Sequence, residues 1–117
     1  MFKGYRKYNK YGAQKTKFMG YTFDSRWEAE RWGELTAMER GGSIKDLERQ
    51  IKYDIVVNGE KICKYVADFR YNQIEEDGSQ KEIVEDAKGV ETADFKLKKK
   101  LMKAVHGIEI KLSKKKH

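Results

Sequence analysis

The spacing of apolar residues predicts two helices. Ser25 followed by Glu28 is typical of a capping box, in which the serine caps the helix and the acid sits in its first turn. The helix that begins there is expected to end near Arg40, before two consecutive glycines. In residues 92–105, apolar side chains recur at helical spacing among lysines, and this pattern predicts the second helix.

Alternation of apolar and polar residues predicts the strands. They are expected at residues 51–57, 61–71, 81–88 and 108–112, with a short extended piece at 20–23. Asn58-Gly59 is a strong hairpin signal, so the first two strands should pair antiparallel. The expected fold class is therefore α/β (α+β). A helix, a three-strand antiparallel meander, a second helix and a last strand would form a mixed sheet flanked by helices.

Length and composition limit the size of the core. The chain has 117 residues, of which 38% are hydrophobic and 38% charged, so one domain with a lean core is expected. No run approaches the roughly 20 apolar residues of a membrane span. The chain start lacks the apolar stretch of a secretory signal, so a cytoplasmic location is expected. One cysteine and two histidines exclude an intrachain disulfide and a zinc cluster built on those residues.

Charge is distributed unevenly along the chain, whose formal net charge is +7. Residues 1–18 carry six Lys or Arg and no acid, and residues 92–117 carry nine lysines and two acids. Basic ends suit a polyanionic partner, because neutralising phosphates releases counterions. The acidic centre between them would be unhelpful there unless its carboxylates hold a cation. This contrast indicates a nucleic-acid enzyme, and the alternative is a soluble protein with disordered, charged ends.

Tyrosines alternate with cationic residues in a basic N-terminal arm, residues 1–18, which precedes a core at 19–112 and a basic tail at 113–117. Such a mixture suits phosphate contact and base stacking. The same tyrosines could instead form one face of a short helix or pin the arm to the core. The candidates for nucleic-acid contact are Lys7, Lys10, Tyr11 and Lys15 of the arm, with Lys96, Lys99 and Lys100 of the second helix.

Two aspartates and a lysine form the candidate chemical site. Asp68 lies in an apolar-flanked strand, where a buried charge is costly unless it is paired. Asp86 and Lys88 are two residues apart on the next strand, so they project from one face about 7 Å apart. Carboxylates on neighbouring strands suit Mg²⁺, which is commonly held by one or two carboxylates, waters and a substrate phosphate. Lys88 could then activate water or stabilise transition-state charge, and Glu28 could add a ligand.

Each of these residues also has a structural alternative. An Asp–Lys pair two apart on a strand is usually a surface ion pair of little energetic consequence. Glu28 is fully explained as the capping-box partner of Ser25. Glu85 is the rival of Asp86 for the catalytic position, but strand alternation places it on the opposite face from Lys88.

The spacing of the acids resembles the PD-(D/E)xK nuclease superfamily. Asp68 and, on the next strand, Asp86-Ala87-Lys88 match its motif, although Ala67 stands where the superfamily has proline. The wider chain is similar to a family of small phage-encoded predicted endonucleases, akin to phage endonuclease-I-type Holliday-junction resolvases. That similarity is carried by Tyr8–Ala13, Phe23–Ser25 with Glu28-Ala29, Leu47–Gln50, Tyr65–Phe69 and Val84–Gly89.

This resemblance implies a restriction-endonuclease-like core and a Mg²⁺-dependent endonuclease acting on DNA, with Mn²⁺ able to substitute and no small-molecule cofactor. It implies that Asp68, Asp86 and Glu28 bind the metal, that Lys88 completes the catalytic set, and that Gln50 lies near the phosphate. Branched DNA, such as a Holliday junction in phage recombination, is the implied substrate. A homodimer is expected because symmetric junctions need two cuts. A non-catalytic DNA-binding module, a protein-binding phage factor and an RNA substrate remain open.

Overall fold

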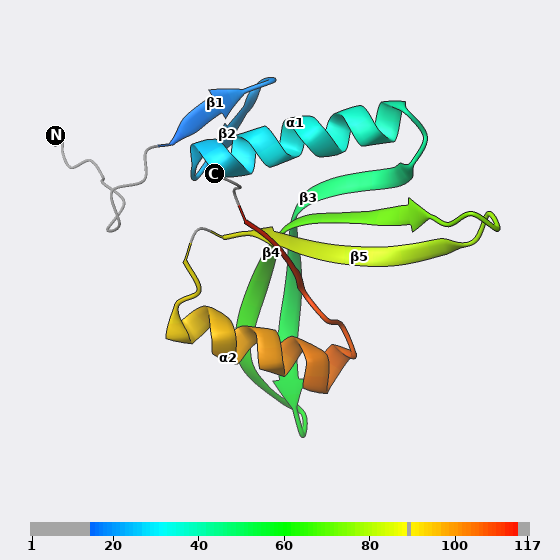
Figure 1. Ribbon diagram of the computed structural model, residues 1–117. Coiled ribbons are helices and arrows are strands. Elements are labelled where there is room, and N and C mark those ends of the chain that lie inside the picture. The colour runs from blue at the N-terminus through cyan, green and yellow to red at the C-terminus, as the bar shows by residue number, and fades with distance from the viewer. Residues whose placement is uncertain (1–14, 89, 115–117) are drawn as a thin grey trace, which may run out of the picture.

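The computed structural model describes residues 15–88 and 90–114, and three of the predicted contact residues, Lys7, Lys10 and Tyr11, lie outside them. The chain forms a small antiparallel hairpin, a long helix, three long strands, a second helix and a short last strand (Figure 1). Their bounds are β1 (Thr16–Phe18), β2 (Tyr21–Phe23), α1 (Arg26–Arg40), β3 (Ile44–Val57), β4 (Glu60–Ile74), β5 (Gln80–Ala87), α2 (Ala93–Leu101), the π-helical turn η1 (Met102–His106) and β6 (Lys111–Ser113).

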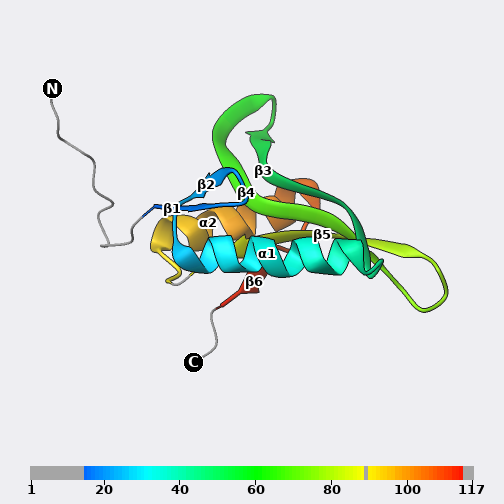
Figure 2. The same cartoon turned by 90° about the horizontal axis from the view of Figure 1, so that it is seen from above.

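The larger sheet has four strands in the order β3-β4-β5-β6. The first three are antiparallel neighbours and β6 runs parallel to β5, so α2 and η1 form the crossover between them. Helices α1 and α2 lie on different sides of the sheet (Figures 1 and 2). The predicted α+β class, with a mixed sheet flanked by helices, is confirmed. None of the helices in the described parts of the chain is long and apolar enough to cross a membrane.

Several element boundaries differ from the sequence prediction. Strand β3 begins at Ile44 rather than 51, and its first part is irregular because Asp46 has a left-handed φ of 57° within a register shift. This irregularity hides the alternation that marks a strand. Strand β6 occupies residues 111–113 rather than 108–112. Residues 16–18, assigned to the predicted arm, pair with β2.

Strand β4 contributes to two separate hydrophobic clusters. Phe69 and Tyr71 pack with α1, whereas Tyr65 and Ala67, on the same alternation of β4, pack with α2 and η1. The β3–β4 hairpin turns away from β5 and reaches down beside α2 (Figure 1). Gln50 of β3, at a left-handed φ of 59°, lies opposite the turning point, between the pairs Arg49–Phe69 and Ile51–Ala67. The bend therefore places Asp68, the residue between these halves of β4, at the junction of the two clusters.

Candidate active site

Asp68 lies where β4 separates from β5. The regular pairing of the two strands ends at Phe69 and Glu85. Just beyond it, the backbone N–H of Ala87 donates to Asp68 Oδ2 at 2.9 Å, so a side chain replaces the strand carbonyl as acceptor. The next step of the same register brings Asp68 beside Asp86. The expected meeting of these carboxylates on adjacent strands is thus present in the structure.

The Asp86 side chain is completely buried and only partly satisfied. Its Oδ2 accepts a hydrogen bond from the Tyr65 hydroxyl, while its Oδ1 has no hydrogen-bond partner. The Lys88 ammonium lies 3.9 Å from Oδ1, at the outer limit of an ion pair, and 5.1 Å from the centre of the Phe95 ring. Asp86 therefore keeps one buried oxygen that points toward no donor within hydrogen-bond range, with a half-buried cation nearby.

Glu28 reaches the same region from the first turn of α1. Ser25 Oγ accepts the Glu28 N–H at 3.1 Å, which confirms the predicted helix cap. The Glu28 carboxylate does not complete the box on Ser25, however, because its Oε1 accepts the backbone N–H of Asp24 at 3.3 Å. Its Oε2 is buried without a hydrogen-bond partner. Glu28 is 3% exposed, and the helix cap gives no reason for burying its Oε2 atom.

The three acids perturb one another electrostatically. Burial raises the pKa of Asp68 to about 9, with further contributions from hydrogen bonding and charge interaction with Asp86 and from the charge of Glu28. Burial also raises the pKa of Glu28, and the charges of Asp24 and Asp86 add to that rise while Arg49 opposes it. Without a cation, these carboxyl groups are therefore harder to ionise than exposed ones.

The donor set fits a hard cation. Two adjacent carboxylates, a third nearby and two buried oxygens without donors are oxygen ligands of the kind Mg²⁺ takes. In residues 15–88 and 90–114, no group of three or more Asp, Glu, His or Cys side chains is arranged to hold a metal ion by itself. One or two carboxylates, Asp68 and Asp86 first, could hold such an ion, with water supplying its other ligands. Glu28 is a further carboxylate, whose charge acts on both Asp68 and Asp86.

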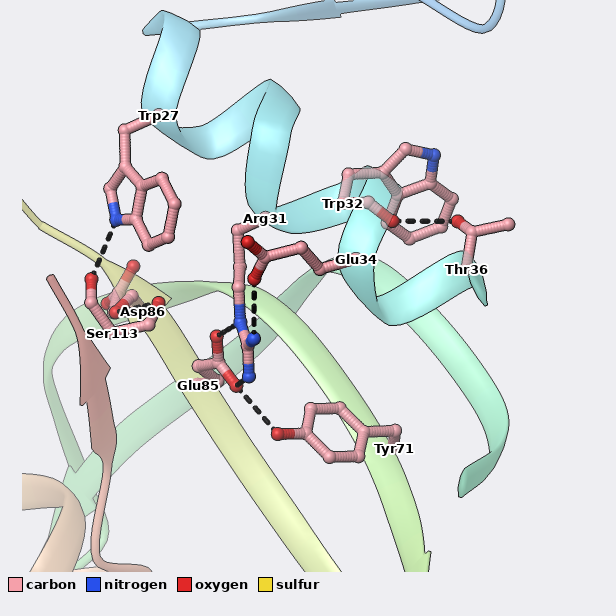
Figure 3. A network of polar contacts seen from close by, with 9 residues as sticks. All are labelled: Trp27, Arg31, Trp32, Glu34, Thr36, Tyr71, Glu85, Asp86 and Ser113. Carbon is pink, nitrogen blue, oxygen red and sulfur yellow. Dashed lines mark hydrogen bonds and ion pairs between the residues drawn. The ribbon is translucent and has the colours of Figure 1, made fainter. Parts of the chain in front are cut away.

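Glu85, the rival acid, has a structural role. Arg31 Nε donates to its Oε2 at 2.6 Å, and the Tyr71 hydroxyl donates to its Oε1 at 2.6 Å (Figure 3). Glu85 is fully buried within this network, which ties β5 to α1 and β4. Its predicted position on the opposite face from Lys88 is consistent with these partners, because they differ from those of Asp86.

The remaining predicted contact residues are spread over the molecule. Gln50 is exposed, and its backbone lies opposite Asp68, between the pairs Arg49–Phe69 and Ile51–Ala67. Lys15 is exposed and pairs with Asp24 at 3.2 Å, near the start of α1. The three lysines at positions 96, 99 and 100 are on α2, away from the α1 end of the site.

Sequence reasoning missed Arg49, which joins the β1–β2 hairpin to the site. Its guanidinium lies over the rings of Phe23 (4.5 Å) and Tyr21 (5.0 Å), and its Nη2 donates to the Thr22 carbonyl at 3.2 Å. Its Nε is buried without a partner, and its charge lowers the pKa of Glu28. The sequence does hold a signal for Arg49: it is a cation two residues before Ile51, at a position that continues the apolar alternation of β3.

A comparison with protein families places the chain. A family model described as "Protein of unknown function (DUF1064)" matches residues 8–116. The chain belongs to the DUF1064 family. No curated protein and no solved structure matches it. The function of this DUF1064 protein is therefore inferred from the chemistry of its own residues.

The raised pKa values predict an unusual pH dependence for the stability of this DUF1064 protein. Native Asp68 holds its proton up to a pH of about 9, whereas the unfolded chain releases it near the ordinary value of 3.8. The unfolded state then binds fewer protons, so without divalent metal the free energy of unfolding should fall as pH rises between these values. Thermal unfolding followed at intervals from about pH 5 to about pH 8.5 measures this. Asp68→Asn should flatten the slope, and an equal slope in both proteins would contradict the assignment.

Proposed function

We propose that this DUF1064 protein is a Mg²⁺-dependent endonuclease that hydrolyses phosphodiester bonds in DNA. The observation that carries the proposal is the pairing of Asp68 and Asp86 at the bend of β4, where Asp86 and Glu28 each keep a buried oxygen without a hydrogen-bond donor. Burial of unsatisfied carboxylates is unfavourable for stability. A role in holding a cation gives a reason for keeping them together.

The residues of the site would divide the work as follows. Asp68 and Asp86 would hold the ion, with Glu28 as a further ligand or as a base for an attacking water. When bound, Mg²⁺ supplies Lewis-acid polarisation of the phosphate and a more acidic water. The Lys88 ammonium lies over Phe95 and 3.9 Å from Asp86, and it would stabilise negative charge on the phosphate oxygens. Gln50 and Arg49, on β3 beside the acids, would position the phosphate.

The finer parts of the proposal rest on the resemblance to phage resolvase-like proteins. Branched DNA, such as a four-way junction in phage recombination, would be the substrate in the host cytoplasm. Two subunits would make the two cuts, and Mn²⁺ would replace Mg²⁺. Sedimentation of the protein alone and with a four-way junction measures the expected dimer, and a complex with one subunit per junction would contradict it.

Cleavage assays test the proposal directly. Purified protein is incubated with linear, nicked, flapped and four-way DNA, with Mg²⁺ or with EDTA. We expect strand cleavage that requires the metal and is strongest on the branched substrates. Binding of all substrates without cleavage would contradict the nuclease and favour a non-catalytic DNA-binding module. Cleavage of RNA but not of DNA would make RNA the substrate. Failure to bind DNA at low salt would favour a protein-binding factor.

A further inference from the structure

A groove runs between β5, the α2–η1 helix and β6. It encloses about 920 Å³, and its floor includes the buried side chains of Val84 and Ile110. Four elements line it with cationic side chains. The lysines that line it are Lys81 of β5, Lys96, Lys99 and Lys100 of α2, Lys103 of η1 and Lys111 of β6.

The groove is strongly positive because its acids are already paired. Three glutamates line it, and each has a cation within ion-pair distance: Glu82 with Arg70 (2.5 Å), Glu91 with Lys114 (3.4 Å) and Glu109 with Lys103 (3.2 Å). The other five groove lysines form no ion pair with any acid in the described part of the chain. Five ammonium groups therefore face this groove without protein counter-charges.

The shape and position of the groove favour an extended anion. Lys96, Lys99 and Lys100 follow helical i, i+3, i+4 spacing, so they project from one side of α2, and Lys81 and Lys111 face them from two strands. None of the described lining side chains is aromatic, so the groove offers contacts to phosphates rather than stacking to bases. Val84 on its floor is two residues from Asp86 on the same face of β5, a separation of about 7 Å.

We infer that this groove binds the phosphate backbone of one DNA strand and directs it to the acids at the end of β5. The inference deepens the proposed function and depends on it for the destination of the strand. The binding itself needs no metal, so the groove can be tested separately from cleavage. Because contacts are to phosphates, binding is expected to be independent of base sequence.

The test measures DNA binding in EDTA, with the full chain, as a function of salt. The double variant Lys99→Gln/Lys111→Gln removes one ammonium from each wall of the groove. The matched control Lys45→Gln/Lys52→Gln removes two exposed lysines of β3. For duplex DNA the groove variant should lower the salt slope of binding by about two and weaken binding about tenfold or more near 0.1 M salt. The control should keep the wild-type slope, and circular dichroism should show both variants folded.

The outcomes separate the groove from the nuclease. An equal loss of DNA binding in the groove and control variants would overturn the proposal that the groove binds DNA, whatever the cleavage assay shows. Loss of binding confined to the groove variant, in a protein that cleaves nothing with Mg²⁺, would retain the groove and reject the nuclease. If polyglutamate competed as well as DNA, mass for mass, the occupant would not be a polynucleotide. If RNA bound more tightly than DNA, the proposal that DNA is the occupant would be wrong.

Discussion

Asp86→Asn is expected to abolish Mg²⁺-dependent cleavage while DNA binding is retained. Asparagine has nearly the shape of aspartate, and its carbonyl oxygen can still accept the Tyr65 hydroxyl that Asp86 accepts. It lacks the charge that would hold the cation. Stabilisation by a catalytic metal amounts to several kcal/mol, so a loss of roughly 10³-fold in the cleavage rate is expected. Single-turnover cleavage of the preferred substrate, with binding measured in EDTA, gives both quantities.

The same variant should also change stability in the opposite direction to activity. The Asp86 charge helps to raise the pKa of Asp68, so Asp86→Asn should lower that pKa and reduce the cost of keeping Asp68 protonated. The metal-free variant should therefore be at least as stable as the wild type near neutral pH. Asp54→Asn is a matched control, because Asp54 is exposed and its side chain pairs with exposed Lys61 at 3.3 Å. We expect the control to cleave normally. An Asp86→Asn protein that cleaves at the control rate would remove Asp86 from the metal site.

Local signals explain what the sequence could predict. Ser25 caps α1, and Asn58-Gly59 turns β3 into β4, because each depends on a few neighbouring residues. Once the hairpins are set, strand alternation places Asp68 beside Asp86 without knowledge of the rest of the fold. The core of the candidate site was predictable for that reason.

Long-range packing explains what the sequence could not show. The bend of β4 arises because its two halves pack on different helices, and the left-handed backbone of Gln50 carries no residue signal such as glycine. Arg49 gains its place by stacking on Phe23, 26 residues away in the chain. The hydrogen bond from Tyr65 to Asp86 likewise joins residues 21 positions apart, and it depends on tertiary packing. These contacts surround the acids, so the surroundings of the site depend on tertiary structure more than its acids do.

Loss of the Arg31 guanidinium is expected to lower the free energy of unfolding far more than loss of an exposed charge of α1. Arg31, whose side chain is 14% exposed, donates from Nε at 2.6 Å and from Nη2 at 3.1 Å to Glu85, which is fully buried (Figure 3). Arg31→Met keeps the aliphatic part of the side chain and leaves the buried Glu85 charge without its guanidinium partner, while the Tyr71 hydroxyl still donates to it. Removing one partner of a buried ion pair costs about 3–5 kcal/mol, which urea unfolding measures.

Two further variants separate the buried charge from the loss of a helix residue. Arg26→Met changes an exposed arginine of the same helix and should alter the free energy of unfolding by no more than about 0.5 kcal/mol. Arg31→Met/Glu85→Leu removes both charges, and should recover most of the lost stability because a buried pair replaced by apolar residues is often neutral. Because Glu85 contacts α1 and β4 rather than Lys88, the double variant should keep Mg²⁺-dependent cleavage. A double variant as unstable as Arg31→Met would show that packing of the arginine, and not the unpaired carboxylate, stabilises the α1–β5 contact.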